Sequence, residues 1–487
     1  MPPIFPRGQA PGCRIPPAAV EARSRGPMDD RTRRLLRGPI GPTLLRLAVP
    51  NVLVMLVQAG VGLLETAFVA RLGTDALAGM ALVFPLVMTV QMISAGAVGG
   101  GILSAVARTL GAGRREAAEA VAWHALAIAL GLGLLTTAAA LLGGPSLYRA
   151  MGAEGATLAA AASYGGVVFA GAALVWLFNA LAAVIRGTGN MALPAGVTCA
   201  GAVVLVPLSP ALIFGLGPLP GLGIVGGAVA ILAYYAAGSA VLIAALCSGR
   251  LVLRLRRPPP LARGPAREIL RVGAASALVS LTTNLTIAAA TGFVARFGPS
   301  AVAGYGTGAR LEYLLVPLVF GLGAPISAMV GTGIGAGDRV RALRVAWTGA
   351  AIAVGLTEAI GLAASLRPDA FLGLFATDPV MREVGARYLR LVGPFYGFAG
   401  LGLALYFAAQ GAGRIAWPLV AGLTRVTVAV GGGWLGSRAG AGLAGIFLAQ
   451  ALGLAALGLI NAGAVAAGAW FRTRPPVAGP LAIRPGA

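Results

Sequence analysis

Three acidic residues lie well inside long apolar stretches of the 487-residue sequence, namely Glu65, Glu312 and Glu358. If these stretches cross a lipid bilayer, each charge costs about 2.5–3.5 kcal/mol near the centre, so each acid needs a role that compensates for its position. A buried carboxyl group can take up and release a proton, or it can bind a cation. Glu358 has no strong polar neighbour at helical spacing, which favours a protonated packing role or a position at the lipid edge.

Glu65 is the first candidate for ion coupling. Gln58 precedes it by seven residues, so the two side chains lie on one helical face and predict a polar stripe directed at the protein interior. The acid is not duplicated, because the equivalent residue in the second half of the chain is Ala290, 225 positions later. An unduplicated acid in a duplicated scaffold favours a functional role. The structural alternative is an interhelical hydrogen bond from a protonated carboxyl group.

Glu312 is the second candidate. Arg310 lies two residues earlier and therefore on a different helical face, so each side chain needs another partner. Both a structural arginine–acid pair across helices and a substrate or proton site fit this pattern. An acid beside aromatic rings suits an organic cation. The residues predicted to line a substrate cavity are Glu312, Arg310, Tyr305, Tyr313, Asn284 and Phe84.

Motifs for other kinds of chemistry are absent from the sequence. One histidine, His124, and three separated cysteines cannot form a His- or Cys-based metal cluster, and there is no nucleophile elbow or Walker loop. We therefore predict no catalytic residue, no metal site and no cofactor, and hence no enzyme. His124 is predicted to lie at the membrane interface.

The elements that must position these residues are membrane-spanning helices. Hydrophobic residues make up 58% of the chain and charged residues 11%, whereas a soluble domain carries about a quarter charged residues. Apolar runs of about 20 residues cross the hydrocarbon core as helices. Twelve such spans are predicted, at residues 43–70, 77–107, 118–143, 157–185, 192–213, 222–247, 267–296, 302–332, 341–364, 388–409, 415–435 and 441–469.

An internal duplication divides these spans into two halves. The motif ETAFVARLGTDALAGMAL at Glu65–Leu82 returns as ATGFVARFGPSAVAGYGT at Ala290–Thr307, 225 positions later, and the Gly-Ala-Gly motif at Gly111 returns at Gly335, 224 positions later. Each half needs the other to bury its inner face. The predicted fold is an all-α integral membrane protein with twelve transmembrane helices in two pseudo-symmetric six-helix bundles.

The distribution of arginine predicts the topology. The net charge is +22, and every basic residue except His124 is an arginine, mostly in tails and in loops at one end of the spans, which marks the cytoplasmic side. Arg382, Arg387 and Arg390 depart from this trend. Twelve apolar runs leave no soluble basic face for nucleic acid. The predicted parts are a disordered basic N-terminal tail (1–42), an N-lobe (43–248), a cytoplasmic Arg/Pro-rich linker (249–266), a C-lobe (267–470) and a cytoplasmic C-terminal tail (471–487).

The start of the chain suggests a second initiation site. The stretch MDDRTRRLL, at Met28–Leu36, is an ordinary juxtamembrane start, and residues 1–27 have no apolar core. One hypothesis is therefore that translation begins at Met28, with a start at Met1 as the alternative. The intact mass of the native protein tests this prediction.

Several motifs resemble the multidrug and toxic compound extrusion (MATE) family of the MOP exporter superfamily. They are the duplicated hairpin, VIRGTGNMALPAGV (Val184–Val197), the stretch YGTGARLEYLLVPLVFGLGAPISAMVGTGIGAG that contains Arg310 and Glu312, and QGAGR (Gln410–Arg414). The resemblance covers about residues 43–470. It implies two bundles facing each other across a central cavity, in the plasma (bacterial inner) membrane, and export driven by a proton or sodium gradient.

The resemblance also implies an ion site in the first half, with a difference in its ligands. The family's acid on the first helix matches Glu65, with Glu in place of the usual Asp. In the DinF-like branch this acid works with an Asn, an Asp and a Thr, which here correspond to Leu205, Ser209 and Ile231. The site is thereby reduced to one carboxylate, which disfavours sodium because hard cations bind several oxygen ligands. Proton coupling through Glu65, with Gln58 on the same face, remains.

The expected function is secondary active efflux. The transporter would export organic compounds, cationic or amphipathic, by cation-coupled antiport, with the proton preferred to sodium. Its partners would be the small-molecule substrate, the coupling ion and the lipid bilayer, and a monomer suffices because two lobes complete one cavity. The alternative is a lipid-linked oligosaccharide flippase of the same superfamily, for which Arg310 and Arg425 are the candidate cavity cations.

Overall fold

A computed structural model describes most of the chain. The described residues are 29–216, 219–255, 262–373, 375 and 378–471, without the side chains of Leu219, Tyr313, Leu314 and Val316. The predicted residues 1–28 and 472–487 of the two tails and residues 256–261 of the linker lie outside the described part.

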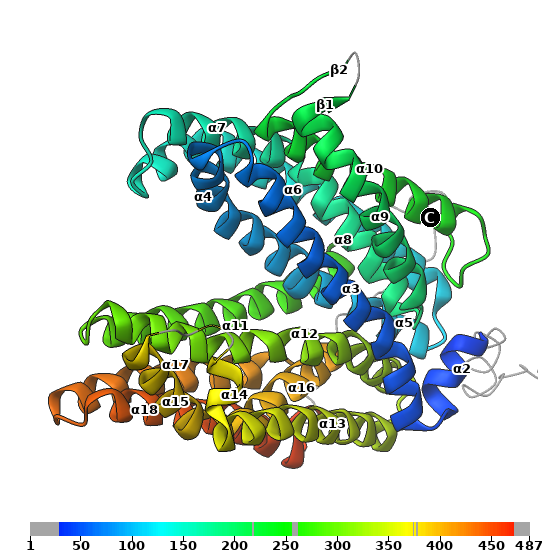
Figure 1. Cartoon of the computed structure of the whole chain (residues 1–487). Helices are drawn as coiled ribbons and strands as arrows, with labels where there is room; N and C mark the ends of the chain where they lie inside the picture. The colour runs from blue at the N-terminus through cyan, green and yellow to red at the C-terminus, as the bar shows by residue number, and fades with distance from the viewer. Residues whose placement is uncertain (1–28, 217–218, 256–261, 374, 376–377, 472–487) are drawn as a thin grey trace, which may run out of the picture.

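The first bundle is formed by helices α3 to α10 (Figure 1). Pro85 and the π-helical turn η1 lie within one long span made of α4, η1 and α5. Gly171 breaks another span, so that α7 and α8 meet at 45°. The elements are α3 (Ile40–Ala70), α4 (Thr74–Gln91), η1 (Met92–Val98), α5 (Gly99–Gly111), α6 (Arg115–Ala150), α7 (Gly155–Ala170), α8 (Ala172–Gly187), α9 (Ala192–Phe214) and α10 (Ile224–Cys247).

The second bundle is formed by helices α11 to α18 (Figure 1). A short 3-10 turn with Pro394 separates α15 from α16 within one span. The elements are α11 (Arg263–Ala295), α12 (Pro299–Gly335), α13 (Arg339–Leu366), α14 (Pro368–Leu372), α15 (Pro379–Val392), η2 (Gly393–Phe395), α16 (Tyr396–Ala412), α17 (Ala416–Arg438) and α18 (Gly442–Ala466).

The predicted fold class is confirmed. Within the described ranges, eleven helical segments are long and apolar enough to cross a membrane, and the bent pair α7–α8 makes a twelfth. The largest boundary difference is at the tenth span, which begins at Pro379 rather than at residue 388. Charged residues of α15 lower the hydropathy there and hide the start of the helix. Among the described residues, the only strands form a two-residue antiparallel pair between β1 (Gly215–Leu216) and β2 (Leu219–Pro220).

The two bundles are close at one end and diverge toward the other, as the arms of a V (Figure 1). At the closed end, α12 packs against α3 and α5, and α11 packs against η1 and α5. Gly111 and Gly335 lie at this crossing: a Cβ on Gly111 would overlap the carbonyl oxygen of Thr332, and one on Gly335 would overlap that of Arg108. The described chain ends lie here too, because Arg341 binds the segment after α2 and Arg339 lies over the ring of Phe471.

A short helix, α2 (Asp30–Arg37), lies within the predicted N-terminal tail 1–42, and α3 already begins at Ile40. Asp29 caps α2, since its side chain accepts a hydrogen bond from the backbone N–H of Arg31 at 3.0 Å. Leu35 is buried against the closed end of the bundles. The ordered part of the chain therefore starts earlier than its basic composition predicts.

Candidate functional site

Glu65 lies inside the first bundle, on the outer half of α3. Its side chain is 5% exposed, and the hydroxyl of Ser209 on α9 donates a hydrogen bond of 2.9 Å to Oε2. The backbone of α10 also lies beside the carboxyl group, because a Cβ added at Gly227 would lie 3.5 Å from Oε2 of Glu65. Helices α3, α9 and α10 thus enclose the carboxyl group, as the sequence predicts for an acid that faces the interior.

The surroundings of Glu65 limit what it can bind. Among the described residues it has no ion-pair partner, and no group of three or more His, Cys, Asp or Glu side chains could hold a metal ion. Glu65 and Ser209 together present three oxygen atoms, fewer than the six or more that calcium and magnesium take up in proteins. A proton needs only one of the two carboxylate oxygens.

The other predicted members of this site lie apart from the carboxyl group. Gln58 is exposed, so the structure does not join it to Glu65 in a buried polar stripe. Leu205 is buried one helical turn before Ser209, and Ile231 packs into the apolar core of the first bundle. Ser209, which sequence comparison with the family pattern identified as a lost ligand, still supplies an oxygen atom to the acid.

Glu312 on α12 forms an ion pair across the second bundle. Arg425 on α17 donates from Nη2 to Oε1 at 3.2 Å, and the hydroxyl of Tyr388 on α15 donates to Oε2 at 3.3 Å. The side chain of Arg425 is 8% exposed and that of Glu312 is 25% exposed. Of the two alternatives left by the sequence, the structure contains the arginine–acid pair, and Arg310 is not its arginine.

Aromatic rings enclose this ion pair. Tyr305 packs edge-on against Tyr388 at 5.3 Å between ring centroids and stacks on Phe447 of α18 at 6.0 Å. Tyr305 is buried, so it contributes to the packed wall of the bundle rather than to an open surface. Tyr388 was not identified from the sequence, because its contact with Glu312 joins two helices at positions 76 residues apart.

The remaining predicted cavity residues are spread over the surface of the spans. Arg310 is exposed and lies over the ring of Phe375 at 5.8 Å, away from Glu312. Asn284 is exposed and donates to the carbonyl of Ser280 on its own helix. Phe84 is 47% exposed. The side chain of Tyr313 lies outside the described residues.

A polar network in the first bundle was missed by sequence reasoning. The amide of Asn179 on α8 donates to Gln91 Oε1 at 2.8 Å and to Ser94 Oγ at 2.9 Å, and Gln91 donates to the hydroxyl of Tyr235 at 2.6 Å. The network lies where α4 meets the π-helical turn η1, a type of distortion that is frequent at functional sites. The signal available in the sequence was an Asn and a Gln inside apolar runs.

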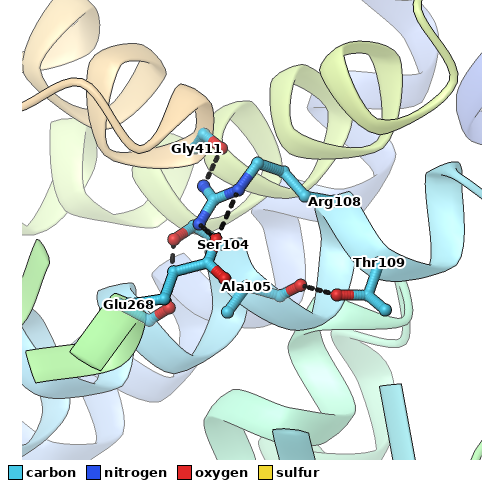
Figure 2. Close-up of polar contacts among 7 residues, drawn as sticks. Ser104, Ala105, Arg108, Thr109, Glu268 and Gly411 are labelled. Carbon is cyan, nitrogen blue, oxygen red and sulfur yellow. Dashed lines mark hydrogen bonds and ion pairs between the residues drawn. The ribbon is translucent and has the colours of Figure 1, made fainter. Parts of the chain in front are cut away.

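At the closed end, Arg108 links the two bundles (Figure 2). From α5 of the first bundle it donates to Glu268 Oε1 on α11 at 2.7 Å and to the carbonyl of Gly411 on α16 at 2.7 Å. Gln410 adds a second link, because its amide donates to the carbonyl of Gly96 at 3.1 Å. These bonds join Arg108 to two helices of the opposite bundle, and they must break if this end opens. We refer to this contact as the Arg108 clasp.

His124 and Glu358 have structural partners. His124 is buried: Nδ1 lies 2.7 Å from the carbonyl of Ala120, and Nε2 accepts from the backbone N–H of Ala262 in the linker at 2.8 Å. The carboxylate of Glu358 accepts from the backbone N–H of Gly397 at 2.6 Å, where α16 starts after the 3-10 turn. Helix starts leave such N–H groups without partners, so a packing role accounts for Glu358.

Comparisons with known proteins bear on the whole chain. The MatE family model matches residues 50–211 and 275–435, once in each half. An FAD transporter of Shewanella oneidensis is 29% identical over 391 residues, covering 78% of this chain and 84% of the relative. A probable multidrug resistance protein NorM of Deinococcus radiodurans is 30% identical over 443 residues, covering 84% and 92%.

Solved structures of transporters are also similar to this chain. A structure described as the outward-facing conformation of a multidrug resistance MATE family transporter of the MOP superfamily has a TM-score of 0.81 and 26% identity, covering 92% of this chain and all of the other. A MOP superfamily transporter from Pyrococcus furiosus, described as having a binding pocket of reverse polarity, has a TM-score of 0.80 and 25% identity over 92% of this chain.

Proposed function

Because the chain belongs to the MatE family of multidrug and toxic compound extrusion transporters, we propose that it exports small organic molecules in exchange for protons that bind at Glu65. That the chain is a multi-pass membrane transporter and not an enzyme follows from the family. The observation that carries the proposal is a buried carboxyl group whose described hydrogen-bond partner is one serine hydroxyl.

Helix α3 connects Glu65 to the contact between the bundles. Its inner half packs against α12, where the amide of Asn51 lies 3.5 Å from the carbonyl of Gly321. Pro50 stands next to Asn51 inside the helix and removes one backbone hydrogen bond, which makes this the point at which α3 bends most easily. Protonation of Glu65 would change how the outer half of α3 packs on α9 and α10, and the bend at Pro50 would pass the change to the interlobe contact.

The orientation follows from charge. The arginine-rich loops lie at the closed end, so the positive-inside rule assigns this end to the cytoplasm and the diverging end to the outside. Both chain ends are then cytoplasmic, and the conformation is outward-facing. In this form the outer half of α3, with Glu65, is at the side from which protons enter a bacterial cell through its inner membrane.

The proposed substrates are amphipathic or cationic organic molecules. The charge of Glu312 is already balanced by that of Arg425. A substrate would therefore meet aromatic and polar groups with little net charge in the second bundle. Glu65 has no basic partner among the described residues, so it favours a positive cargo when unprotonated. The proton and the substrate would then compete for binding in the first bundle, and such competition is required for the exchange of one for the other.

Transport in proteoliposomes tests the proposal. A lipophilic cationic dye and FAD, chosen because one relative is described as an FAD transporter, would be assayed with proton and sodium gradients imposed separately. We expect proton-driven dye transport that Glu65→Gln abolishes and that Glu154→Gln, an exposed acid of the same lobe, leaves unchanged. Undiminished proton-driven transport by Glu65→Gln would remove Glu65 from the mechanism, and transport driven by sodium alone would refute proton exchange.

A further inference from the structure

A basic pocket lies at the closed end of the first bundle. It has a volume of about 690 Å³ and is bounded by α2, the start of α3 and the turn between α8 and α9. Its charged lining consists of Arg31, Arg34 and Arg46, all of which are exposed. Three guanidinium groups around one pocket attract a phosphate group, because arginine binds phosphate oxygens through paired N–H donors.

No acidic side chain of the described residues neutralises this pocket. Its described lining contains no Asp or Glu, and none of its three arginines forms an ion pair with a described acid. The nearby acids are already used, since Asp30 pairs with Arg33 at 3.2 Å and Asp29 caps helix α2. The positive charge of the pocket is therefore available to a ligand.

The wall that α2 contributes is held in place by both bundles. Arg341 of α13 donates from Nε to the carbonyl of Leu35 at 2.9 Å and from Nη2 to that of Gly38 at 2.7 Å. On the other side, Leu35 packs against Gly189 so closely that a Cβ there would lie 2.8 Å from Leu35 Cδ1. Two of the three arginines are thus presented by a fixed element of the fold.

An apolar groove continues from the pocket. It has a volume of about 520 Å³, runs along α9 and α10, and shares Ala192 with the basic pocket. On α9 it extends from Ala192 to Leu208, which is about 24 Å at the helical rise of 1.5 Å per residue. Half of a bilayer's hydrocarbon core is about 15 Å thick, so the groove is long enough for an acyl chain.

We propose that the basic pocket and the apolar groove together bind one anionic phospholipid of the membrane. Its phosphate lies against Arg31, Arg34 and Arg46, and one acyl chain lies in the groove from Ala192 toward Leu208. Neither part alone selects such a ligand, because a soluble phosphate needs no groove and a neutral lipid needs no arginines. Because the basic pocket and the apolar groove meet at Ala192, they adjoin in the same way as the headgroup and the acyl chain of a phospholipid.

Native mass spectrometry of the full chain in mild detergent tests this site, with phosphatidylglycerol titrated against phosphatidylethanolamine. We expect one phosphatidylglycerol to bind the wild type preferentially. The triple variant Arg31→Gln, Arg34→Gln and Arg46→Gln should weaken its binding about a hundredfold, since each arginine near a membrane surface contributes about fivefold. A matched triple variant at exposed arginines outside the pocket, Arg37, Arg114 and Arg344, should retain it.

A second variant tests the groove separately and does not depend on the arginines. Gly196 lies in the groove, and a Cβ there would meet no atom within 4 Å, so Gly196→Leu fills the chain site without a clash. We expect it to weaken phosphatidylglycerol binding, whereas Gly131→Leu, at another open glycine on α6, should not. Equal losses in the two arginine triples, unchanged binding by Gly196→Leu, or equal displacement by glycerol 3-phosphate would each overturn the proposal.

Discussion

The crossing of α5 and α12 at the closed end offers the sharpest test of how the two bundles move. Gly111 meets the carbonyl oxygen of Thr332, and Gly335 meets that of Arg108, both too closely for any Cβ. The obstacles are backbone atoms, which cannot rotate away as a side chain can. Gly335→Ala must therefore force the helices apart.

The size of the effect follows from the cost of overpacking. An extra methyl group in a well-packed site costs about 1–3 kcal/mol. The cost falls on the form in which this end is closed, so the equilibrium should shift by about 5- to 150-fold toward a form in which it is open. In the proposed transport cycle that form is inward-facing, with the diverging end of the V closed.

Double electron–electron resonance measures this shift directly. Labels at Ala78→Cys and Ala303→Cys occupy equivalent, exposed positions near the diverging end, one on α4 and one on α12. We expect Gly335→Ala to add a population with a shorter distance between the labels. The background requires serine at the native cysteines Cys13, Cys199 and Cys247.

The duplication adds a stringent requirement to this test. Gly111 and Gly335 are equivalent residues that make equivalent contacts, so Gly111→Ala should produce a shift of similar size. Gly131→Ala, where an added Cβ meets no atom within 4 Å, should produce none. An unchanged distance distribution in both crossing variants, or an effect of only one of them, would refute the view that the crossing is a shared steric lock.

Three further variants test individual contacts by thermal unfolding or proteolysis. A double-mutant cycle of Arg108→Gln and Glu268→Gln should give a coupling of about 1 kcal/mol, because Glu268 is 41% exposed, and Arg108→Gln alone should cost more because it also loses its carbonyl acceptor; zero coupling would contradict the clasp. Glu312→Gln should destabilise the protein by about 3–5 kcal/mol by leaving Arg425 buried and unpaired, and adding Arg425→Met should recover much of the loss; a neutral single variant would contradict this. His124→Leu should speed tryptic cleavage of the interlobe linker, since the linker loses its acceptor, and an unchanged rate would remove that role.

The sequence predicted the helices well because apolar composition and span length are local properties. An acid in an apolar run is also visible locally, which is why Glu65 could be identified. The existence of α2 was not predicted, because five charged residues among the eight of Asp30–Arg37 hide the burial of Leu35, which depends on contacts with both bundles.

The side-chain partners of the predicted acids could not be inferred from the sequence. The sequence predicted that Glu312 needs a partner other than Arg310, and an arginine–acid pair across helices was one alternative. It could not name the arginine, which is 113 positions later, on α17. Arg310, which was also predicted to line the cavity, lies on a different face of α12 from Glu312 and over the ring of Phe375. Pairing across helices depends on their packing, which a pattern along one helix does not contain.

The duplicated scaffold carries Glu65 and Glu312, two acids inside its spans, at positions where the acid is not duplicated. Glu65 corresponds to Ala290, and the residue 225 positions before Glu312 is Val87, so each bundle has an acid where the other has an apolar side chain. The close helix crossing involves both halves equally, because Gly111 of the first half and Gly335 of the second occupy equivalent positions. A shared crossing allows the bundles to rock about a common contact, but by itself it favours neither direction. An ion shifts such an equilibrium only through a group whose surroundings differ between the two states. In the proposed mechanism Glu65 is such a group, because the helix that carries it is also the one that packs against α12.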